Sequence, residues 1–380
     1  MKAPLRAALS ALLLSVSAAL LCASCSCSRR TPAPAPEAAA ENPAAAAMAA
    51  ARAEAARAAA EEAERARAAA EAARREEEAR ARVESTRGPA DPAAALALRT
   101  PPPKGAKART VGRNPWRGAI AVDADSGRIL FEDAADTPCL PASMTKMMLL
   151  LVVQERIEAG AVRTNDVVAV SERAFKTGGS QVYLDPRESF PLEDMLYAVM
   201  VQSANDAAVA VAEHVAGSCE AMVSLMNRRA SELGMRDTSF SSVHGLPAAP
   251  GALDDVSTPR DMAILSRELC KHPGAMRYAG ESYRVFRPEP RLFEMRTHNP
   301  ALQPGSRIPG ADGLKTGYTR RAGYSLSVSA ERGGRRVVAV MMGTAVENAK
   351  GELDPASSKR LRNAKISELV ERAFSALAEP

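Results

Sequence analysis

Ser143 and Lys146 form the only Ser-x-x-Lys motif in the 380-residue chain, and this pairing could carry out acyl transfer. A serine hydroxyl becomes a good nucleophile when a neighbouring base takes its proton. A lysine three residues later in a helix lies on the same face, within reach of that hydroxyl. Because Met and Leu surround Lys146, its ammonium would be desolvated and its pKa lowered, which favours a neutral base. The motif is also compatible with a helix-capping serine and a lysine that extends to solvent.

Ser203 and Asn205 form the only Ser-x-Asn motif, and they lie between two predicted helices. A hydroxyl and an amide at this place could relay a proton and hold a substrate amide. Either side chain could instead be the N-cap of the helix that is expected to begin at Asp206. The motif becomes informative only in combination with the others.

The triplet Lys-Thr-Gly occurs twice, at residues 176–178 and 315–317. The second copy leads into two alternating strands, so it can lie on a sheet edge that faces the nucleophile. There, Lys315 would offer a cation and Thr316 a hydroxyl to a substrate carboxylate, while Gly317 leaves space. The first copy lies in a Gly-rich stretch, and we predict a loop for it.

The three motifs in this order resemble the signature of penicillin-binding proteins and serine β-lactamases. Longer stretches are similar to the low-molecular-mass serine D-alanyl-D-alanine carboxypeptidases, peptidase family S11. The similarity covers about Pro115 to Leu377. The stretches that carry it are Pro141–Lys146, Ser203–Ala208, Met226–Asn227, Leu233–Met235, His244–Leu246 and Asp312–Thr319.

The resemblance implies an enzyme that removes the terminal D-alanine from peptidoglycan stem pentapeptides through an acyl-enzyme. It also implies that β-lactams acylate the same serine as covalent inhibitors, and that no cofactor or metal takes part. By this resemblance, Ser143 is the nucleophile, Lys146 is its base, and Ser203 passes a proton to the leaving D-alanine. Asn205 binds the stem peptide, and Lys315 and Thr316, beside Gly317, bind the terminal carboxylate. The backbone N–H groups of Ser143 and Tyr318 are the oxyanion donors.

Other functions remain open at this point. An endopeptidase that cuts D-Ala cross-links would use the same residues, and a penicillin-binding sensor or slow β-lactamase would keep the same motifs. The Glu-x-x-Leu-Asn motif, with which class A β-lactamases activate the deacylating water, is not found. A spacer protein whose helical arm is its main purpose is the remaining alternative.

Composition argues against two further classes of function. The net charge is only +5, and no arginine stripe is interleaved with aromatic residues, so nucleic-acid binding is not expected. The cysteine and histidine spacings match no zinc site, so no metal ligands are assigned.

From Pro115 onward the apolar pattern predicts a globular domain, and the resemblance implies that residues 114–380 are the catalytic domain. Strands near both ends with helices between them favour an α+β fold, an antiparallel sheet flanked by helices. The resemblance implies that this is the penicillin-binding/serine β-lactamase-like transpeptidase fold. Cys139 is interpreted as a small packing residue and Asp261 as part of a helix cap. The expected strands are 118–122, 128–131, 324–330 and 336–342, and the expected helices are 143–157, 192–200, 206–216, 220–233, one that begins at 259 after the N-cap Thr258, and 360–377.

The first 27 residues are expected to be a signal peptide, because a charged start precedes an apolar run from Ala7 to Leu21. Cys25 is the candidate for lipidation in a lipoprotein signal, although Cys22 stands where that pattern usually has Leu. The protein is therefore expected to be exported, and to lie in the periplasm or on the outside face of a membrane with a possible N-terminal lipid.

Residues 28–113 are expected to be a spacer that is Pro/Ala-rich at first and then rich in Ala, Glu and Arg. Its segment 44–85 consists of strong helix formers without a coiled-coil seam, which favours a solvated single helix over disorder. Fully helical, that segment would reach roughly 60 Å. Family members often carry a C-terminal β domain and membrane helix for which this chain ends too soon, so attachment is expected at the N-terminus.

Overall fold

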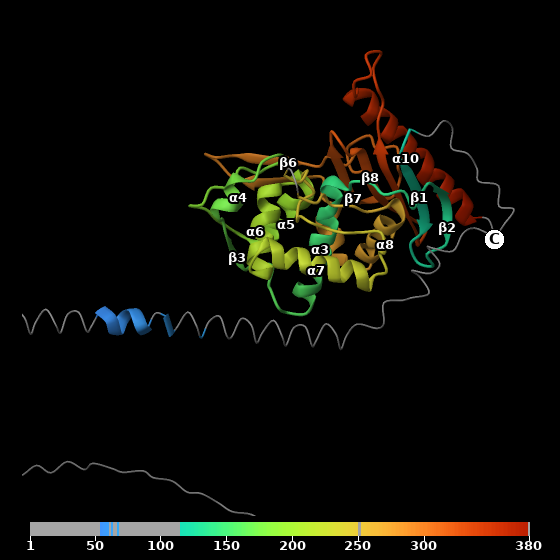
Figure 1. The fold of residues 1–380 in the computed structure, drawn as a ribbon. Helices are drawn as coiled ribbons and strands as arrows, with labels where there is room; N and C mark the ends of the chain where they lie inside the picture. Colours follow the sequence, from blue (N-terminus) through green and yellow to red (C-terminus); the bar gives the residue numbers. More distant parts are fainter. Residues whose placement is uncertain (1–53, 61, 64–66, 68–114, 250–251, 379–380) are drawn as a thin grey trace, which may run out of the picture. The chain divides into compact units, whose positions relative to one another are not determined.

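The computed structural model describes residues 54–60, 62–63, 67, 115–249 and 252–378, and Figure 1 shows its fold. The predicted signal peptide, Cys25 and most of the spacer lie outside the described residues. Residues 54–60 are helical and exposed, and the predicted spacer as a whole stays a prediction. Within the described residues no single helix is long and apolar enough to cross a membrane, although one sharply bent pair, α6 (Asn205–Ala216) with α7 (Cys219–Glu232), meets both criteria together.

A five-stranded antiparallel sheet with the order β2-β1-β9-β8-β7 forms the centre of the domain. The two hairpins predicted near the ends of the domain are confirmed, and β9 joins them by pairing with β1. The predicted Lys-Thr-Gly strand is β7, which lies at the sheet edge. The strands are β1 (Gly118–Asp123), β2 (Ile129–Asp133), β7 (Ala311–Thr319), β8 (Gly323–Arg332) and β9 (Arg335–Thr344).

Side chains of the sheet alternate between two apolar cores, one on each face. Along β9, Val338 and Val340 pack in the core shared with the central helices, whereas Val337 and Ala339 pack in the core beneath α10 (Pro355–Ala378). The alternation follows from the two-residue period of a strand. Figure 1 shows α10 on one side of the sheet and the other helices opposite. The predicted α+β class is therefore confirmed.

The central helices form the layer that carries two of the three motifs. Helix α3 is buried on all sides over its first turns, as its apolar sequence predicted. Thr258 caps α8 as predicted, because its Oγ1 accepts a hydrogen bond from the backbone N–H of Asp261. The helices are α3 (Lys146–Glu158), α4 (Glu172–Lys176), α5 (Leu192–Tyr197), α6 (Asn205–Ala216), α7 (Cys219–Glu232), α8 (Pro259–Cys270) and α9 (Pro273–Ala279), with a 3-10 turn η1 (Ala142–Thr145) before α3 and a π turn η2 (Ala198–Gln202) after α5.

Several local predictions need correction. The predicted helix at 143–157 begins with the 3-10 turn η1, and the last helix begins at Pro355 rather than near residue 360. Lys176 ends the short helix α4, so the loop predicted for the first Lys-Thr-Gly copy is wrong at that residue. Two small sheets were not predicted; they pair β3 (Val167–Ala169) with β4 (Ser189–Pro191), and β5 (Tyr283–Arg287) with β6 (Phe293–Arg296).

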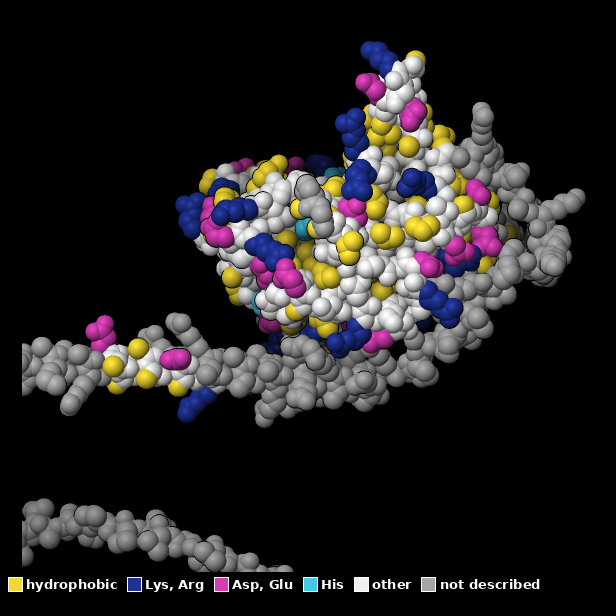
Figure 2. Space-filling view, in the orientation of Figure 1, with side chains coloured by type: hydrophobic (Ala, Val, Ile, Leu, Met, Phe, Trp, Pro, Cys, Tyr) yellow, Lys and Arg dark blue, Asp and Glu magenta, His cyan; other side chains and the backbone are white. Residues whose placement is uncertain are grey.

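The surface in Figure 2 mixes both signs of charge. Lys and Arg side chains are scattered over this face, and Asp and Glu lie among them rather than on a separate side. The distribution agrees with the mild net charge of +5. The charges that matter for chemistry are instead buried.

Candidate active site

Ser143 lies in the 3-10 turn η1, immediately before α3. Neither η1 nor α3 has a side-chain hydrogen bond at its N-cap, so the interpretation of Ser143 as a helix cap is wrong. Strand β7 packs against this turn through Gly317. A Cβ atom at Gly317 would lie 2.4 Å from the carbonyl oxygen of Pro141, so only glycine allows this close approach.

Lys146 is fully buried at the start of α3, so the alternative of a lysine that extends to solvent is wrong. Its Nζ lies 3.2 Å from Oγ of Ser143. It donates to Oδ1 of Asn205 at 2.6 Å and to the carbonyl oxygen of His244 at 2.8 Å. Two N–H groups of a neutral amine satisfy these two acceptors, which leaves the nitrogen lone pair for the Ser143 hydroxyl.

The surroundings of Lys146 favour that neutral state. Burial lowers its pKa well below the ordinary value, and the nearby positive charge of Lys315 lowers it further. Asp255 and Asp206 act in the opposite direction. The imidazole of His244 is neutral at physiological pH, because burial, the largest cause, lowers its pKa to about 3.

Ser203 follows the π turn η2 in a left-handed backbone conformation, with φ of 62°. The N-cap residue of α6 makes no side-chain hydrogen bond, so the capping interpretation is wrong for both Ser203 and Asn205. Both side chains instead contact the other motifs. Oγ of Ser203 accepts a hydrogen bond from Nζ of Lys315 at 2.9 Å, and Asn205 contacts Lys146.

Lys315 is a buried cation that has no acidic partner. Its Nζ donates to Ser203 and, at 3.2 Å, to the carbonyl oxygen of Thr316. Within residues 115–249 and 252–378, no carboxylate oxygen lies within 4.0 Å of this ammonium. Burial lowers its pKa to about 7. A buried cation of this kind is stabilised by an anionic ligand such as a substrate carboxylate.

Thr316, Gly317 and Tyr318 continue the same edge strand. Thr316 is nearly buried, whereas the Tyr318 ring is partly exposed and stacks on Tyr324 with 4.2 Å between the ring centroids. The structure thus brings together Ser143, Lys146, Ser203, Asn205 and Lys315 through hydrogen bonds. The backbone donors assigned to the oxyanion remain a prediction.

The first Lys-Thr-Gly copy also lies near this site, although its lysine faces away. Lys176 is 72% exposed and pairs with Glu172 at 2.9 Å. The residues after Lys176 contact the site. Nδ2 of Asn205 donates to the carbonyl oxygen of Gly178 at 2.8 Å, and the backbone N–H of Asn205 donates to the carbonyl oxygen of Ser180 at 2.7 Å. Sequence reasoning missed these contacts; the paired glycines were the available signal for a close backbone approach.

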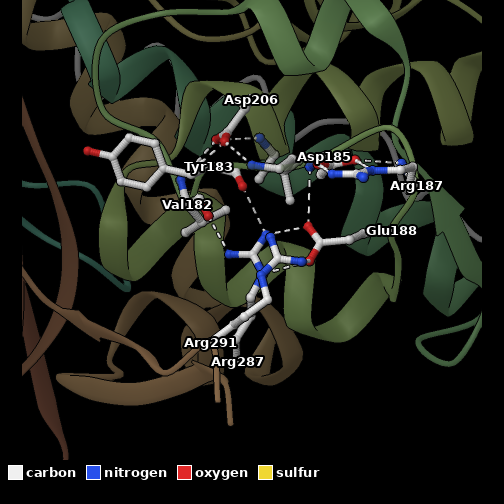
Figure 3. A network of polar contacts seen from close by, with 10 residues as sticks. Val182, Tyr183, Asp185, Arg187, Glu188, Asp206, Arg287 and Arg291 are labelled. Atoms are coloured by element: carbon white, nitrogen blue, oxygen red, sulfur yellow. Dashed lines mark hydrogen bonds and ion pairs between the residues drawn. The ribbon is translucent and has the colours of Figure 1, made fainter. Parts of the chain in front are cut away.

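A polar network holds the chain that follows Ser180, and Figure 3 shows it from close by. The carboxylate of Asp206 accepts from the backbone N–H of Val182 at 3.1 Å. The Arg287 guanidinium donates to the carbonyl oxygens of Val182 at 2.5 Å and Tyr183 at 3.0 Å, and to both carboxylate oxygens of Glu188. The small β5–β6 sheet, which carries Arg287, therefore anchors a segment that contacts Asn205.

Two residues near the site have structural roles, as predicted. Cys139 is buried, and burial raises the pKa of its thiol to about 11, so it stays protonated and unreactive at neutral pH. The carboxylate of Asp261 accepts from the backbone N–H of Asp237 at 2.8 Å and from Oγ1 of Thr238 at 2.9 Å.

One group of side chains in the described residues has the spacing of a metal site, namely Glu155, Glu268 and His272. The Arg229 guanidinium already donates to Glu155 and Glu268, at 2.7 Å each. This cluster is therefore an ion-pair network, and we assign no metal ligand to it.

Comparisons with known proteins agree with this geometry. Residues 114–346 match the family described as D-alanyl-D-alanine carboxypeptidase. The chain is 34% identical over 261 residues to the D-alanyl-D-alanine carboxypeptidase DacF of Bacillus subtilis, which covers 68% of this chain and 62% of that protein. It is 37% identical over 246 residues to DacC of Escherichia coli, covering 62% of this chain and 58% of that one. The chain thus spans about three fifths of the length of these two relatives.

Solved structures are similar over the same region. The D-alanyl-D-alanine carboxypeptidase of Mycobacterium tuberculosis superposes with a TM-score of 0.61 and 27% identity, over 71% of this chain and 95% of that one. Penicillin-binding protein D2 of Listeria monocytogenes, in its ampicillin-bound form, gives a TM-score of 0.58 and 26% identity, over 68% of this chain and 97% of that one. The described domain thus has the fold of penicillin-binding proteins, as the motifs predicted.

Proposed function

The chain belongs to the D-alanyl-D-alanine carboxypeptidase family, peptidase family S11, and from this premise we propose that it removes the terminal D-alanine from peptidoglycan stem peptides. One observation carries the proposal. A fully buried lysine, Lys146, lies 3.2 Å from the hydroxyl of Ser143, and the buried Ser203–Lys315 pair stands beside them. This arrangement can activate a hydroxyl and bind a carboxylate at the same place.

Acylation would begin when neutral Lys146 takes the proton of Ser143, as Oγ bonds to the carbonyl carbon of the penultimate D-alanine. The backbone N–H groups of Ser143 and Tyr318 would stabilise the oxyanion. When this intermediate collapses, the C–N bond breaks, Ser203 passes its proton to the nitrogen of the leaving D-alanine, and the proton that Lys146 took replaces it on Ser203. Lys146 is then neutral again and can act as the base for deacylation. Lys315 would hold the terminal carboxylate throughout, because none of the described Asp and Glu side chains pairs with its ammonium.

Deacylation would use water. A water molecule attacks the ester carbon, Lys146 takes its proton, and the Ser143 oxygen leaves and is reprotonated. β-Lactams would acylate Ser143 in the same way and persist as the ester, because they mimic the terminal dipeptide. Penicillin-binding protein D2 of Listeria monocytogenes, which has this fold, binds ampicillin.

The test combines two measurements on the purified protein. Free D-alanine is measured after incubation with a stem pentapeptide, and covalent labelling is measured with a fluorescent penicillin. We expect both from the wild type and neither from Ser143→Ala. Full labelling of Ser143→Ala would remove that residue from the role of nucleophile, and labelling of the wild type without D-alanine release would instead indicate a penicillin-binding sensor.

We also propose that the protein is exported and tethered through a lipid on Cys25. The support is the apolar run of residues 7–21 after a charged start, followed by a cluster of three cysteines. The Ala/Glu/Arg-rich spacer would then separate the catalytic domain from the membrane and extend it toward peptidoglycan.

A further inference from the structure

Asp255 is a buried carboxylate, only 5% exposed, that the mechanism above does not use. Its Oδ1 accepts from the backbone N–H groups of Ser241 at 2.7 Å and Ser242 at 2.8 Å. Its Oδ2 accepts from Oγ1 of Thr145 at 2.8 Å and from Oγ of Ser242 at 2.9 Å. One side chain therefore joins two segments that are far apart in the sequence, and each of them touches the catalytic pair.

The first connection reaches the nucleophile. Thr145 lies between Ser143 and Lys146 and occupies the N-cap position of α3. A threonine at an N-cap usually accepts a hydrogen bond from its own helix, but this one makes no capping bond. Its hydroxyl instead donates to Asp255, which fixes the turn that carries both catalytic side chains.

The second connection reaches the base. Oγ of Ser242 accepts from the backbone N–H of Gly245 at 2.8 Å, which closes a tight loop around His244. The carbonyl oxygen of His244 is one of the two acceptors of Lys146 Nζ. Gly245 also packs on the nucleophile turn, because a Cβ atom at this position would lie 1.9 Å from the carbonyl oxygen of Ala142.

Asp255 also acts on Lys146 through its charge. The charged and titratable groups that act on Lys146 are Lys315, which lowers its pKa together with burial, and Asp255 and Asp206, which raise it. His244 is neutral and contributes a carbonyl dipole. Loss of the negative charge at residue 255 should therefore stabilise the neutral amine further.

We propose that Asp255 is a positioning residue for acylation. It fixes the turn at Thr145 relative to the loop at His244, so that the amine of Lys146 lies within hydrogen-bond distance of the hydroxyl of Ser143. The inference rests on the proposed function of this site. In the described part of the chain, the hydrogen bonds of Asp255 go to Thr145, Ser241 and Ser242 and none goes to Lys315, the residue assigned to the substrate carboxylate. We therefore expect its loss to lower kcat far more than it changes KM.

Asp255→Asn and Asp255→Ala test this inference, and Asp254→Asn is the matched control. Asn keeps an acceptor for the two backbone N–H groups but removes the charge, whereas Ala removes every contact. Asp254 is the adjacent carboxylate in the sequence, but it pairs with Arg321 at 2.7 Å and accepts from the backbone N–H of Ala248 at 2.9 Å, and within the described residues it makes no bond to Thr145, Ser241 or Ser242. Penicillin acylation rates, kcat and KM for D-alanine release, and melting temperatures are measured from pH 5 to 9.

For Asp255→Ala we expect acylation slower by on the order of 100-fold, the usual cost of a catalytic group misplaced by about 1 Å. For Asp255→Asn we expect a folded protein that acylates more slowly. Its acylation rate falls at acidic pH as Lys146 gains a proton, and this acidic limb of the pH profile should move to lower pH by about one unit. A defect that only loosened the fold would leave the position of that limb unchanged. Asp254→Asn should match the wild type in rate and in pH dependence.

Two outcomes separate this inference from the proposed function. If the wild type neither releases D-alanine nor binds penicillin, the proposed function is wrong. If the wild type does both, and Asp255→Asn has the same rate and the same acidic limb, Asp255 is not a positioning residue. The same conclusion follows if Asp254→Asn is as slow as Asp255→Asn, because the effect would then be unspecific.

Discussion

Lys146 and Lys315 are both buried, but the proposed acylation requires them in opposite protonation states. Lys146 has two carbonyl acceptors and lies near a second cation, conditions that favour a neutral amine. Lys315 contacts a hydroxyl and a backbone carbonyl, and a substrate carboxylate would restore its full charge. The difference lies in the neighbours of each lysine and not in the residue type.

The duplicated Lys-Thr-Gly triplet provides a matched pair of substitutions. Lys315→Ala should slow penicillin acylation by several orders of magnitude, because a buried charge-assisted contact with the carboxylate is lost. Lys176→Ala should change kcat/KM by less than about tenfold, which is about 1.4 kcal/mol, since Lys176 is exposed and pairs only with Glu172. Both rates are measured with the same fluorescent penicillin. A larger defect in Lys176→Ala would show that the two copies have been assigned wrongly.

The pKa of Lys315 predicts how acylation depends on pH. The free enzyme needs this ammonium charged, and burial lowers its pKa to about 7, so kcat/KM should fall as the pH rises through about 7. At lower pH, Lys146 gains a proton and activity should fall again, because a protonated amine cannot act as the base. In Lys315→Arg the charge persists at high pH, so the alkaline limb should disappear. An unchanged limb in that variant would assign it to another group.

At the scale of elements, regular structure was more predictable than the irregular turns between elements. The β8–β9 hairpin and the Thr258 cap were expected because alternation and capping are local signals. The 3-10 turn at Ser143 and the left-handed backbone at Ser203 carry no such signal. Both depend on distant packing, as the approach of Gly317 to Pro141 illustrates.

The candidate site divides in the same way. The five residues that the structure joins by hydrogen bonds were predicted from their motifs. A motif gives residue types and spacing, however, and does not show which distant backbone segments contact those residues. The contact of Asn205 with Gly178, the carbonyl of His244 at Lys146 and the carboxylate of Asp255 arise from segments remote in the chain. These contacts became visible only in the folded structure.

The network in Figure 3 predicts how much the β5–β6 sheet stabilises the domain. Arg287 is nearly buried and donates to Glu188 and to the carbonyl oxygens of Val182 and Tyr183, so Arg287→Ala removes all these bonds and should destabilise the protein by about 2 to 4 kcal/mol. Arg291 contacts the same carboxylate at 2.7 Å but is 59% exposed, and Arg291→Ala should cost less than about 1 kcal/mol. Urea unfolding of both variants measures the difference. Equal losses would mean that the exposed pair carries the anchoring.

At the scale of the whole molecule, the site lies where the sheet meets the central helices. The helical layer contributes Ser143, Lys146 and Ser203, and the edge strand β7 contributes Lys315. The two layers meet through the Gly317 contact with the nucleophile turn, so the catalytic geometry depends on their relative position. Only while Gly317 stays packed on the nucleophile turn can the lone pair of Lys146 and the charge of Lys315 act on the same substrate molecule.

The proposed lipid tether predicts where this catalytic domain is found in the cell. A diacylglyceryl group and a third acyl chain on Cys25 would anchor the protein stably, because two or more acyl chains are sufficient. Cys25→Ala should therefore move the protein from the membrane fraction to the soluble fraction, while labelling by fluorescent penicillin stays at the wild-type level. Residue 25 is remote in sequence from every member of the candidate site, so labelling serves as the control for folding. If both proteins fractionate identically and mass spectrometry finds no lipid on Cys22, Cys25 or Cys27, the tether proposal is wrong.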